Sequence, residues 1–301
     1  MGGALIDEVD YVCFTGSTST GRIVGERAGR RLIGASLELG GKNPMLVLRD
    51  ADVERAAEGA VRACFSSSGQ LCVSIERILV ADEVYDRFVQ RFVERVEAMR
   101  MAADFSFETD MGSLISPAQM QTVTAHIADA VRCGATVLAG GRARPDIGPL
   151  FHEPTVLADV TPAMACFGEE TFGPVVSLYR FADEEDAVAR PNQGTYGLNA
   201  SIYSRDVRRA RRLAAQVMCG TVNINEGFAA SFGSLDSPMG GMRDSGTGRR
   251  QGLEGVRRYT EAQTVAVQRG FPLVAPSFMS GATYANVTTA TLRLMKRLGR
   301  P

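Results

Sequence analysis

Lysine and histidine are scarce in this sequence, and its charges nearly cancel. Lysine occurs only at Lys42 and Lys296, histidine occurs only at His126 and His152, and the formal net charge is -1. A net charge this small gives no general attraction to nucleic acid, so we expect no nucleic-acid partner. We interpret the preference for arginine over lysine as a compositional habit and not as a binding signal.

The six cysteines do not form the groupings that hold metals or build disulfide frameworks. No two of them are spaced C-x-x-C, and neither histidine accompanies such a pair. We therefore expect no metal site. The spacing also fits a reducing, cytoplasmic environment better than an extracellular one. The cysteines are Cys13, Cys64, Cys72, Cys133, Cys166 and Cys219.

Segments that would direct the chain to a membrane are also lacking. Residues 1–20 have neither the basic start nor the apolar core of a signal peptide. No apolar stretch approaches the roughly 20 residues that span a bilayer, so we expect no membrane partner. The composition, 45% apolar and 22% charged, is that of an ordinary globular protein. The length of 301 residues is more than a single simple domain usually has.

Strands and helices are predicted to alternate along the first 225 residues. This alternation favours an α/β fold with a largely parallel sheet. Strands are expected at 9–14, 36–39, 44–48, 75–80, 135–139, 198–203 and 221–224, and helices at 20–32, 51–64, 82–99, 117–133, 183–189 and 206–218.

The chain after residue 225 is less regular. Residues 227–248 are rich in glycine and serine and predict a loop, whereas 264–267 predict one more strand. In the tail, 271–301, the segment 288–298 places leucines and a methionine among arginines and a lysine, which indicates a basic amphipathic helix. We favour a docked or solvated tail over a membrane-surface helix there.

Two short segments carry residues suited to catalysis. In the first, 65–72 (F-S-S-S-G-Q-L-C), small residues precede Cys72, which lets a substrate approach the thiol. A buried, inert cysteine is the alternative. In the second, 37–44 (L-E-L-G-G-K-N-P), Glu38 stands between apolar residues. Burial there would raise its pKa toward neutrality, as suits a general base; a surface acid beside a turn is the alternative.

These segments together resemble the aldehyde dehydrogenase superfamily, with the cysteine 34 residues after the glutamate. Further matches occur in the expected order: F-T-G-S at 14–17 with Gly21, E-E-T-F-G-P-V at 169–175, Y-G-L-N-A-S at 196–201 and G-G-M-R-D-S-G at 240–246. The resemblance runs from about residue 9 to 268 and implies a catalytic α/β domain plus a remnant of a Rossmann-like cofactor domain. The implied parts are 1–40 (end of the dinucleotide-binding domain), 41–236 (catalytic domain), 237–270 (return segment and oligomerisation strand) and 271–301 (tail).

The resemblance also implies a role for each matched residue. Cys72 would attack an aldehyde, and Glu38 would activate the water that hydrolyses the resulting thioester. The residues implied to bind NAD or NADP are Gly16, Ser17, Leu39, Glu170 and Phe172. Ser231 and Ser234 are weaker candidates for binding the substrate, and the family implies a homo-oligomer.

Two departures from the family pattern affect these expectations. The sequence contains no P-W-N segment, which in the family supplies the asparagine of the oxyanion hole, and Ser67 stands where asparagine is usual. The family's first βαβ units, which hold a dinucleotide, have no counterpart here. An inactive truncated subunit that cannot bind cofactor is therefore the alternative to an active enzyme, and we expect Val12 and Phe14 to lack neighbouring strands and to be unburied.

The segments around Cys72 and at 244–250 most resemble bacterial succinate-semialdehyde dehydrogenases of the actinobacterial type. Some of those enzymes place an arginine just before G-Q-x-C, where Ser66, Ser67 and Ser68 stand here. The choice between NAD and NADP stays open. An acyl-phosphate or acyl-thioester reductase is a second alternative, but Glu38 argues against it because such an enzyme must keep water from its thioester.

Overall fold

The computed structural model describes residues 2–104, 106–269 and 273–299. The chain divides into two compact units, Met1–Thr260 and Glu261–Pro301. The four-part division implied by the resemblance stays a prediction.

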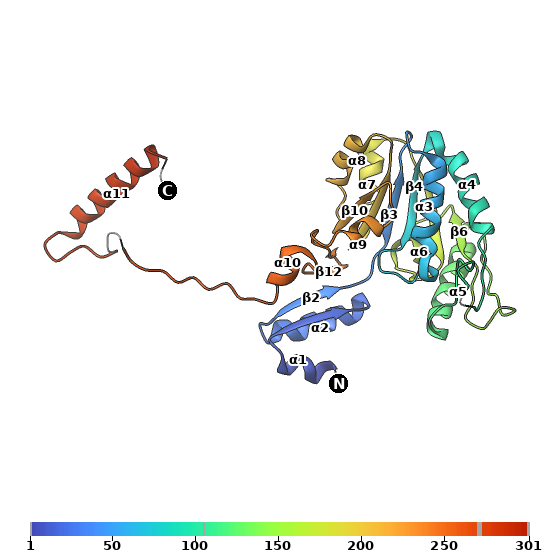
Figure 1. Ribbon diagram of the computed structural model, residues 1–301, viewed down its shortest axis with the longest axis horizontal. Coiled ribbons are helices and arrows are strands. Elements are labelled where there is room, and N and C mark those ends of the chain that lie inside the picture. Colours follow the sequence, from blue (N-terminus) through green and yellow to red (C-terminus); the bar gives the residue numbers. More distant parts are fainter. Residues whose placement is uncertain (1, 105, 270–272, 300–301) are drawn as a thin grey trace. The chain divides into compact units, whose positions relative to one another are not determined.

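A mainly parallel sheet is the centre of the first unit (Figure 1). Within the described residues its neighbouring strands are all parallel except for the antiparallel pair β5 and β6. This arrangement confirms the predicted α/β class. The strand order is β10 (Thr221–Ile224), β9 (Asn199–Tyr203), β3 (Asn43–Val47), β4 (Ile75–Ala81), β7 (Val175–Phe181), β6 (Thr155–Ala158) and β5 (Thr136–Ala139).

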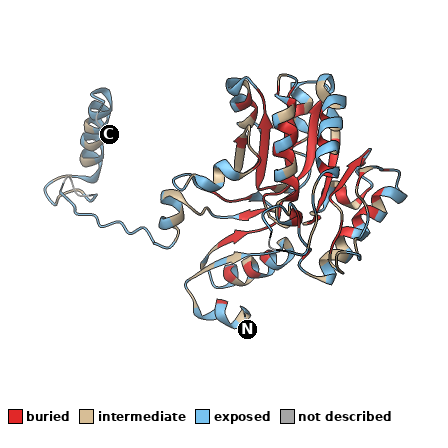
Figure 2. Ribbon diagram, turned by 45° about the vertical axis from the view of Figure 1, so that its right-hand side comes forward, coloured by how far each residue is buried: buried red, intermediate tan, exposed pale blue. Residues whose placement is uncertain are grey.

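Helices cover both faces of this sheet, so its central strands are buried on both sides, as Figure 2 shows in red. Met45 and Val47 of β3 pack with α3 (Val53–Phe65) and α4 (Tyr85–Glu97). Leu46 packs on the opposite face with α7 (Glu184–Ala189) and α8 (Val207–Ala214). Alternate residues of β3 thus pack into the hydrophobic cores on opposite faces of the sheet. For this reason nearly every residue of the strand is apolar.

The helices predicted at 51–64 and 117–133 are present, and each begins at a residue that caps it. Asp52 is the N-cap of α3 and accepts a hydrogen bond from the backbone N–H of Arg55. Ser116 caps α5 (Pro117–Arg132) in the same way, and Gly134 follows that helix with a positive φ of 101°. The helix predicted at 206–218 is shorter, because the chain tightens into turns after Ala214. The predicted helix from residue 82 begins with the 3₁₀ turn η2 (Asp82–Val84).

A smaller sheet lies beside the N-terminal helices. Its order among the described residues is β1 (Tyr11–Thr15), β2 (Gly34–Glu38) and β12 (Gly246–Thr247), with β1 and β2 parallel. It packs against α2 (Thr18–Arg30), and α2 contacts α1 (Gly2–Glu8), which the sequence reasoning missed. The expectation that Val12 and Phe14 are unburied is wrong: both are partly buried against a cluster that includes Ile6 and Val24.

The segment predicted as a loop at 227–248 contains short elements. They are α9 (Ala229–Gly233), β11 (Met242–Arg243) and β12, and β11 pairs antiparallel with β8 (Tyr196–Gly197). Before β7 lies α6 (Ala165–Gly168), and after β12 lies α10 (Gly252–Arg257). These elements are too short to show a clear period in the sequence.

The second unit contains one helix among its described residues, α11 (Gly281–Arg297), capped by Ser280. Helix α11 confirms the helix predicted in the tail, but it begins seven residues before the predicted start at 288. Its Leu292 and Leu294 are exposed. The strand predicted at 264–267 is wrong for this single chain, since residues 261–269 have no regular structure. A strand is defined by its ladder of hydrogen bonds and needs a partner. No helix of the described residues is long and apolar enough to cross a membrane.

Candidate active site

Cys72 follows a sharp turn at the end of α3. The 3₁₀ turn η1 (Ser66–Gly69) contains three consecutive left-handed residues, Ser67, Ser68 and Gly69, with φ of 55°, 56° and 71°. Gly69 is also required sterically, because a Cβ there would lie 2.1 Å from the carbonyl oxygen of Gly173. The turn reverses the chain before β4 and leaves Cys72 half-buried at its exit.

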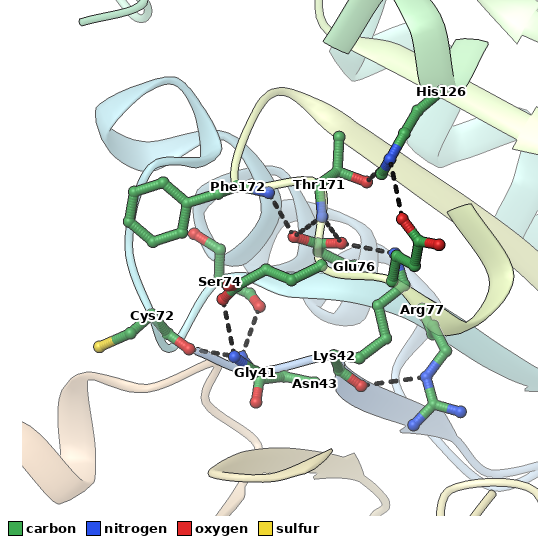
Figure 3. A network of polar contacts seen from close by, with 12 residues as sticks. Gly41, Lys42, Asn43, Cys72, Ser74, Glu76, Arg77, His126, Thr171 and Phe172 are labelled. Atoms are coloured by element: carbon green, nitrogen blue, oxygen red, sulfur yellow. Dashed lines mark hydrogen bonds and ion pairs between the residues drawn. The ribbon is translucent and has the colours of Figure 1, made fainter. Parts of the chain in front are cut away.

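Side chains from neighbouring elements fix the backbone around this cysteine (Figure 3). Asn43 Nδ2 donates to the carbonyl oxygens of Cys72 and Ser74, both at 2.8 Å. Gln70 Oε1 accepts a hydrogen bond of 2.8 Å from the backbone N–H of Ile115. The loop is therefore held rigidly before any ligand arrives, as a nucleophile requires.

Glu38 is the last residue of β2, and its side chain is only 10% exposed. Its Oε1 is buried and has no hydrogen-bond partner among the described residues, while its Oε2 lies 3.9 Å from Arg250 Nε. Burial raises the pKa of Glu38, and the charges of Arg250, Arg258 and Arg249 oppose that rise. A buried carboxylate with a free oxygen and a raised pKa is suited to accept a proton from water.

The thiol of Cys72 is held in a partly apolar, partly charged setting. Its pKa is raised, mainly by burial; Arg250 lowers it, and Glu38 and Glu170 raise it further. The thiol form therefore dominates at neutral pH, so attack on a substrate requires a base to take the proton when the sulfur reacts.

The residues implied to bind the cofactor pyrophosphate lie where β1 meets α2. Ser17 caps α2, its Oγ accepting from the backbone N–H of Thr20 at 3.3 Å. The N–H of Gly16 donates to the carbonyl oxygen of Glu38 at 3.1 Å, which ties this turn to the candidate base. Leu39 is buried against Gly21, where a Cβ would lie 2.4 Å from Leu39 Cδ2. A helix N-terminus beside the carboxyl ends of parallel strands suits a dinucleotide.

Glu170 and Phe172 belong to the loop between α6 and β7. Glu170 Oε1 accepts a hydrogen bond of 2.7 Å from the backbone N–H of Gly41. A Cβ on Gly40 would lie 2.1 Å from Glu170 Oε2, so glycine is needed for this approach. Burial, and then the charge of Glu76, raise the pKa of Glu170 to about 7. Phe172 has a φ of 50°, an unusual conformation for a bulky residue.

Glu76 holds that loop in place and was missed by the sequence reasoning. Its carboxylate, 3% exposed, accepts hydrogen bonds from the backbone N–H groups of Thr171 and Phe172 at 2.9–3.0 Å and pairs with Lys42 Nζ at 2.5 Å (Figure 3). The one available signal was a charged pair, Glu76 and Arg77, in an otherwise apolar strand. These contacts offset the strain at Phe172.

A cavity of about 560 Å³ brings the predicted residues together. It is lined by all seven residues assigned above to catalysis or cofactor binding, which are Cys72, Glu38, Gly16, Ser17, Leu39, Glu170 and Phe172. Residues that lie far apart in the sequence thus meet at one site.

Ser231 and Ser234 do not line this cavity. Ser231 Oγ donates to the carbonyl oxygen of Phe228, and Ser234 Oγ lies 2.7 Å from Ser237 Oγ. Both hydroxyls therefore have partners within their own segment. Among the described residues no group of three or more histidines, cysteines and carboxylates is placed to hold a metal ion.

Replacing Lys42 with methionine is expected to lower the free energy of unfolding by about 3–5 kcal/mol, because it leaves the Glu76 charge buried without its partner. Denaturant titration measures this change. The double variant Lys42→Met/Glu76→Gln should recover much of the loss, since glutamine can still accept from the loop N–H groups. Arg100→Met breaks an exposed pair with Glu108 and serves as the control with almost no effect. Equal stabilities for Lys42→Met and Arg100→Met would contradict the role given to the buried pair.

Comparison with known families now identifies the class of this chain. The model of the aldehyde dehydrogenase family matches residues 1–265, and the chain belongs to that family. A betaine aldehyde dehydrogenase (betB) from Staphylococcus aureus, solved in complex with NAD+, superimposes with a TM-score of 0.82 at 35% identity, covering 86% of this chain and 52% of that one. The predicted aldehyde-dehydrogenase-like fold is thereby confirmed.

Curated proteins of similar sequence include two kinds of aldehyde dehydrogenase. "Putative succinate-semialdehyde dehydrogenase (NADP(+))" from Mycolicibacterium smegmatis is 51% identical over 298 residues, which cover 99% of this chain and 58% of that protein. A "Betaine aldehyde dehydrogenase" from Brucella melitensis is 38% identical over 275 residues, covering 90% of this chain and 56% of that protein. The chain thus spans little more than half the length of the curated relatives it matches.

Proposed function

We propose that this protein oxidises an aldehyde to a carboxylic acid with NAD or NADP, using Cys72 as nucleophile and Glu38 as general base. The observation that carries the proposal is the single cavity that Cys72 and Glu38 share with the candidate cofactor residues. The cavity is mostly apolar and large enough for a nicotinamide ring and its ribose. Ser17 at a helix start and the carboxylate of Glu170 supply the polar groups that such a ligand needs.

The proposed reaction has two stages on Cys72. A base takes the thiol proton as Sγ bonds to the carbonyl carbon, and backbone N–H groups of the cysteine loop stabilise the oxyanion. A bound nicotinamide cofactor supplies the acceptor for the hydride that leaves this carbon, which makes the adduct an acyl thioester. Glu38 then takes a proton from water, the water oxygen bonds to the carbonyl carbon, and the C–S bond breaks as the leaving sulfur takes up the proton from Glu38. The acid leaves, and Cys72 is restored.

The buried, unpaired Oε1 of Glu38 favours this hydrolytic reaction over an acyl-phosphate or acyl-thioester reductase. A reductase must keep water from the thioester, and a poised base beside the cysteine would promote the wrong reaction.

We propose succinate semialdehyde as the substrate. The support is the name of the curated proteins that match at 50–51% identity over almost the whole chain. Their names specify NADP(+), whereas the structural neighbour was solved with NAD+, so both cofactors are to be assayed.

We further propose a homo-oligomer in the reducing cytoplasm. A catalytic thiol needs a reducing setting, and all six cysteines are free. Residues 264–267, which have no regular structure and no strand partner among the described residues, would pair with the sheet of a second copy. Light scattering coupled to gel filtration measures the assembly.

The alternative is an inactive subunit that cannot hold a cofactor. The observation that favours it is the small size of the cofactor-side sheet, which has three strands among the described residues, one of them only two residues long. A dinucleotide is normally held across a crevice between two βαβ halves.

Calorimetric titration of a polypeptide with residues 1–301 measures whether these residues hold a cofactor by themselves. The affinity and activity measurements below use a protein that also has the part of its relatives' length that these residues do not span. For that polypeptide alone we expect no useful binding of NAD or NADP. Micromolar binding of either cofactor would refute this expectation and remove the inactive alternative. Whether the protein oxidises succinate semialdehyde with formation of reduced cofactor is the direct test of the proposed activity.

Cofactor affinity is expected to fall as the pH is lowered through about 7. The raised pKa means that Glu170 is a carboxylate above that pH and a neutral acid below it. Only the carboxylate can accept hydrogen bonds from both ribose hydroxyls through its two oxygens. Titrations at about pH 6 and about pH 8 measure the change, and Glu170→Gln should remove it. A pH dependence that persists in that variant would assign the titration to another group.

A further inference from the structure

Arg250 lies beside Glu38, and its backbone is held by a pair of hydrogen bonds. Its N–H donates to the carbonyl oxygen of Met239 and its carbonyl oxygen accepts from the N–H of Met239, both at 2.7 Å. Arg250 does not line the cavity that the cofactor residues share. The segment at 244–250 resembles the family in its sequence, but the resemblance implies no role for Arg250.

The guanidinium of Arg250 has unused hydrogen-bonding capacity. Its Nε is buried, makes no hydrogen bond within the described residues and is 3.9 Å from Glu38 Oε2. Its Nη2 donates only to Met239 Sδ, at 3.3 Å, and its Cζ lies 5.7 Å from the centre of the Phe232 ring. Sulfur is a weak acceptor. No hydrogen bond to an oxygen among the described residues therefore occupies the side of the guanidinium that could bind a carboxylate through two N–H groups.

The charges around Cys72 indicate what the guanidinium of Arg250 could bind. Glu38 and Glu170 place two negative charges near the thiol, and Arg250 is the cation that counteracts them there. A substrate that adds a third carboxylate a few bonds from the sulfur would be repelled unless a cation received it. The remaining neighbours of Cys72 in its cluster are apolar: Leu71, Val73, Leu198, Phe228 and Met239.

We propose that Arg250 binds the distal carboxylate of the substrate and selects short aldehydes that carry such a group. This inference rests on the proposed aldehyde oxidation and identifies a specificity residue for it. Arg250 would receive the carboxylate through its unpaired N–H groups while the aldehyde carbon reaches Cys72, and the apolar neighbours would contact the methylenes between them.

The test compares succinate semialdehyde with butanal, which has the same carbon chain without the carboxylate. In Arg250→Met the ratio of kcat/KM for succinate semialdehyde to that for butanal should fall about 100-fold, because a hydrogen-bonded pair of opposite charges is lost. Arg250→Lys keeps the charge without the fork and should recover part of the ratio. Arg257→Met, an exposed position on α10, is the matched control with an unchanged ratio.

An equal loss on both aldehydes would overturn the proposal, because Arg250 would then act only on Cys72 or Glu38. A ratio that stays at the wild-type value in Arg250→Met would overturn it as well. The Arg250→Lys variant gives the same comparison if methionine prevents folding.

A second readout separates failure of this inference from failure of the proposed function. Succinate should protect Cys72 from alkylation by iodoacetamide more strongly than butyrate does, and Arg250→Met should abolish the difference. If the wild-type protein oxidises neither aldehyde but shows this Arg250-dependent protection, the carboxylate site stands and the oxidation is wrong. If succinate and butyrate protect equally in the wild-type protein, the carboxylate site is wrong.

Discussion

Replacing Cys72 with serine should reduce aldehyde oxidation by a factor of roughly 10⁴ or more while leaving the fold intact. A serine hydroxyl is a far weaker nucleophile than a thiol, and no base among the described residues lies in hydrogen-bond contact with this side chain to activate it. The side chain is half-buried and its size barely changes, so the unfolding transition should stay where it is in the wild type. Steady-state assays with succinate semialdehyde measure the loss.

Cys133→Ser is the matched control for this variant, because that thiol is exposed at the C-terminal end of α5 and does not line the cavity. It should retain wild-type activity. Substantial oxidation by Cys72→Ser, with a normal fold, would show that another group attacks the aldehyde.

Replacing Glu38 with glutamine should slow thioester hydrolysis more than hydride transfer. Glutamine keeps the shape of the buried side chain but cannot take a proton from water, a function that usually contributes about 10²–10⁴ to a rate. Rapid mixing should therefore show a burst of reduced cofactor, close to one per active site, followed by slow turnover. If the burst itself disappears, Glu38 acts before the thioester forms, for example on the thiol of Cys72.

The fold was largely predictable because its strands and helices carry strong local signals. The buried run at β3 and the capped helices α3 and α5 have the periods and caps that define such elements. The strand predicted at 264–267 is absent because no strand among the described residues pairs with that segment. Helix α1 was missed because Gly2 and Gly3 weaken any helical signal there.

The site was predictable only through matched motifs. Nothing in the local sequence says that Glu38 and Cys72, from separate elements, meet in one cavity; the resemblance supplied that expectation. Glu76 and Arg250 were not predicted as site residues, because their roles depend on contacts between distant parts of the chain. Glu76 contacts the loop at 171–172, and Arg250 contacts Glu38. A charged residue in a buried strand is a weak signal until its partners are known.

Mass spectrometry of the Glu38→Gln variant, quenched shortly after mixing with succinate semialdehyde and cofactor, tests the central claim most directly. The account predicts a succinyl group bound as a thioester to the peptide that contains Cys72, present only when cofactor is added and absent in Cys72→Ser/Glu38→Gln. Formation of reduced cofactor without any acyl group on Cys72, or with the acyl group on another cysteine, would contradict it.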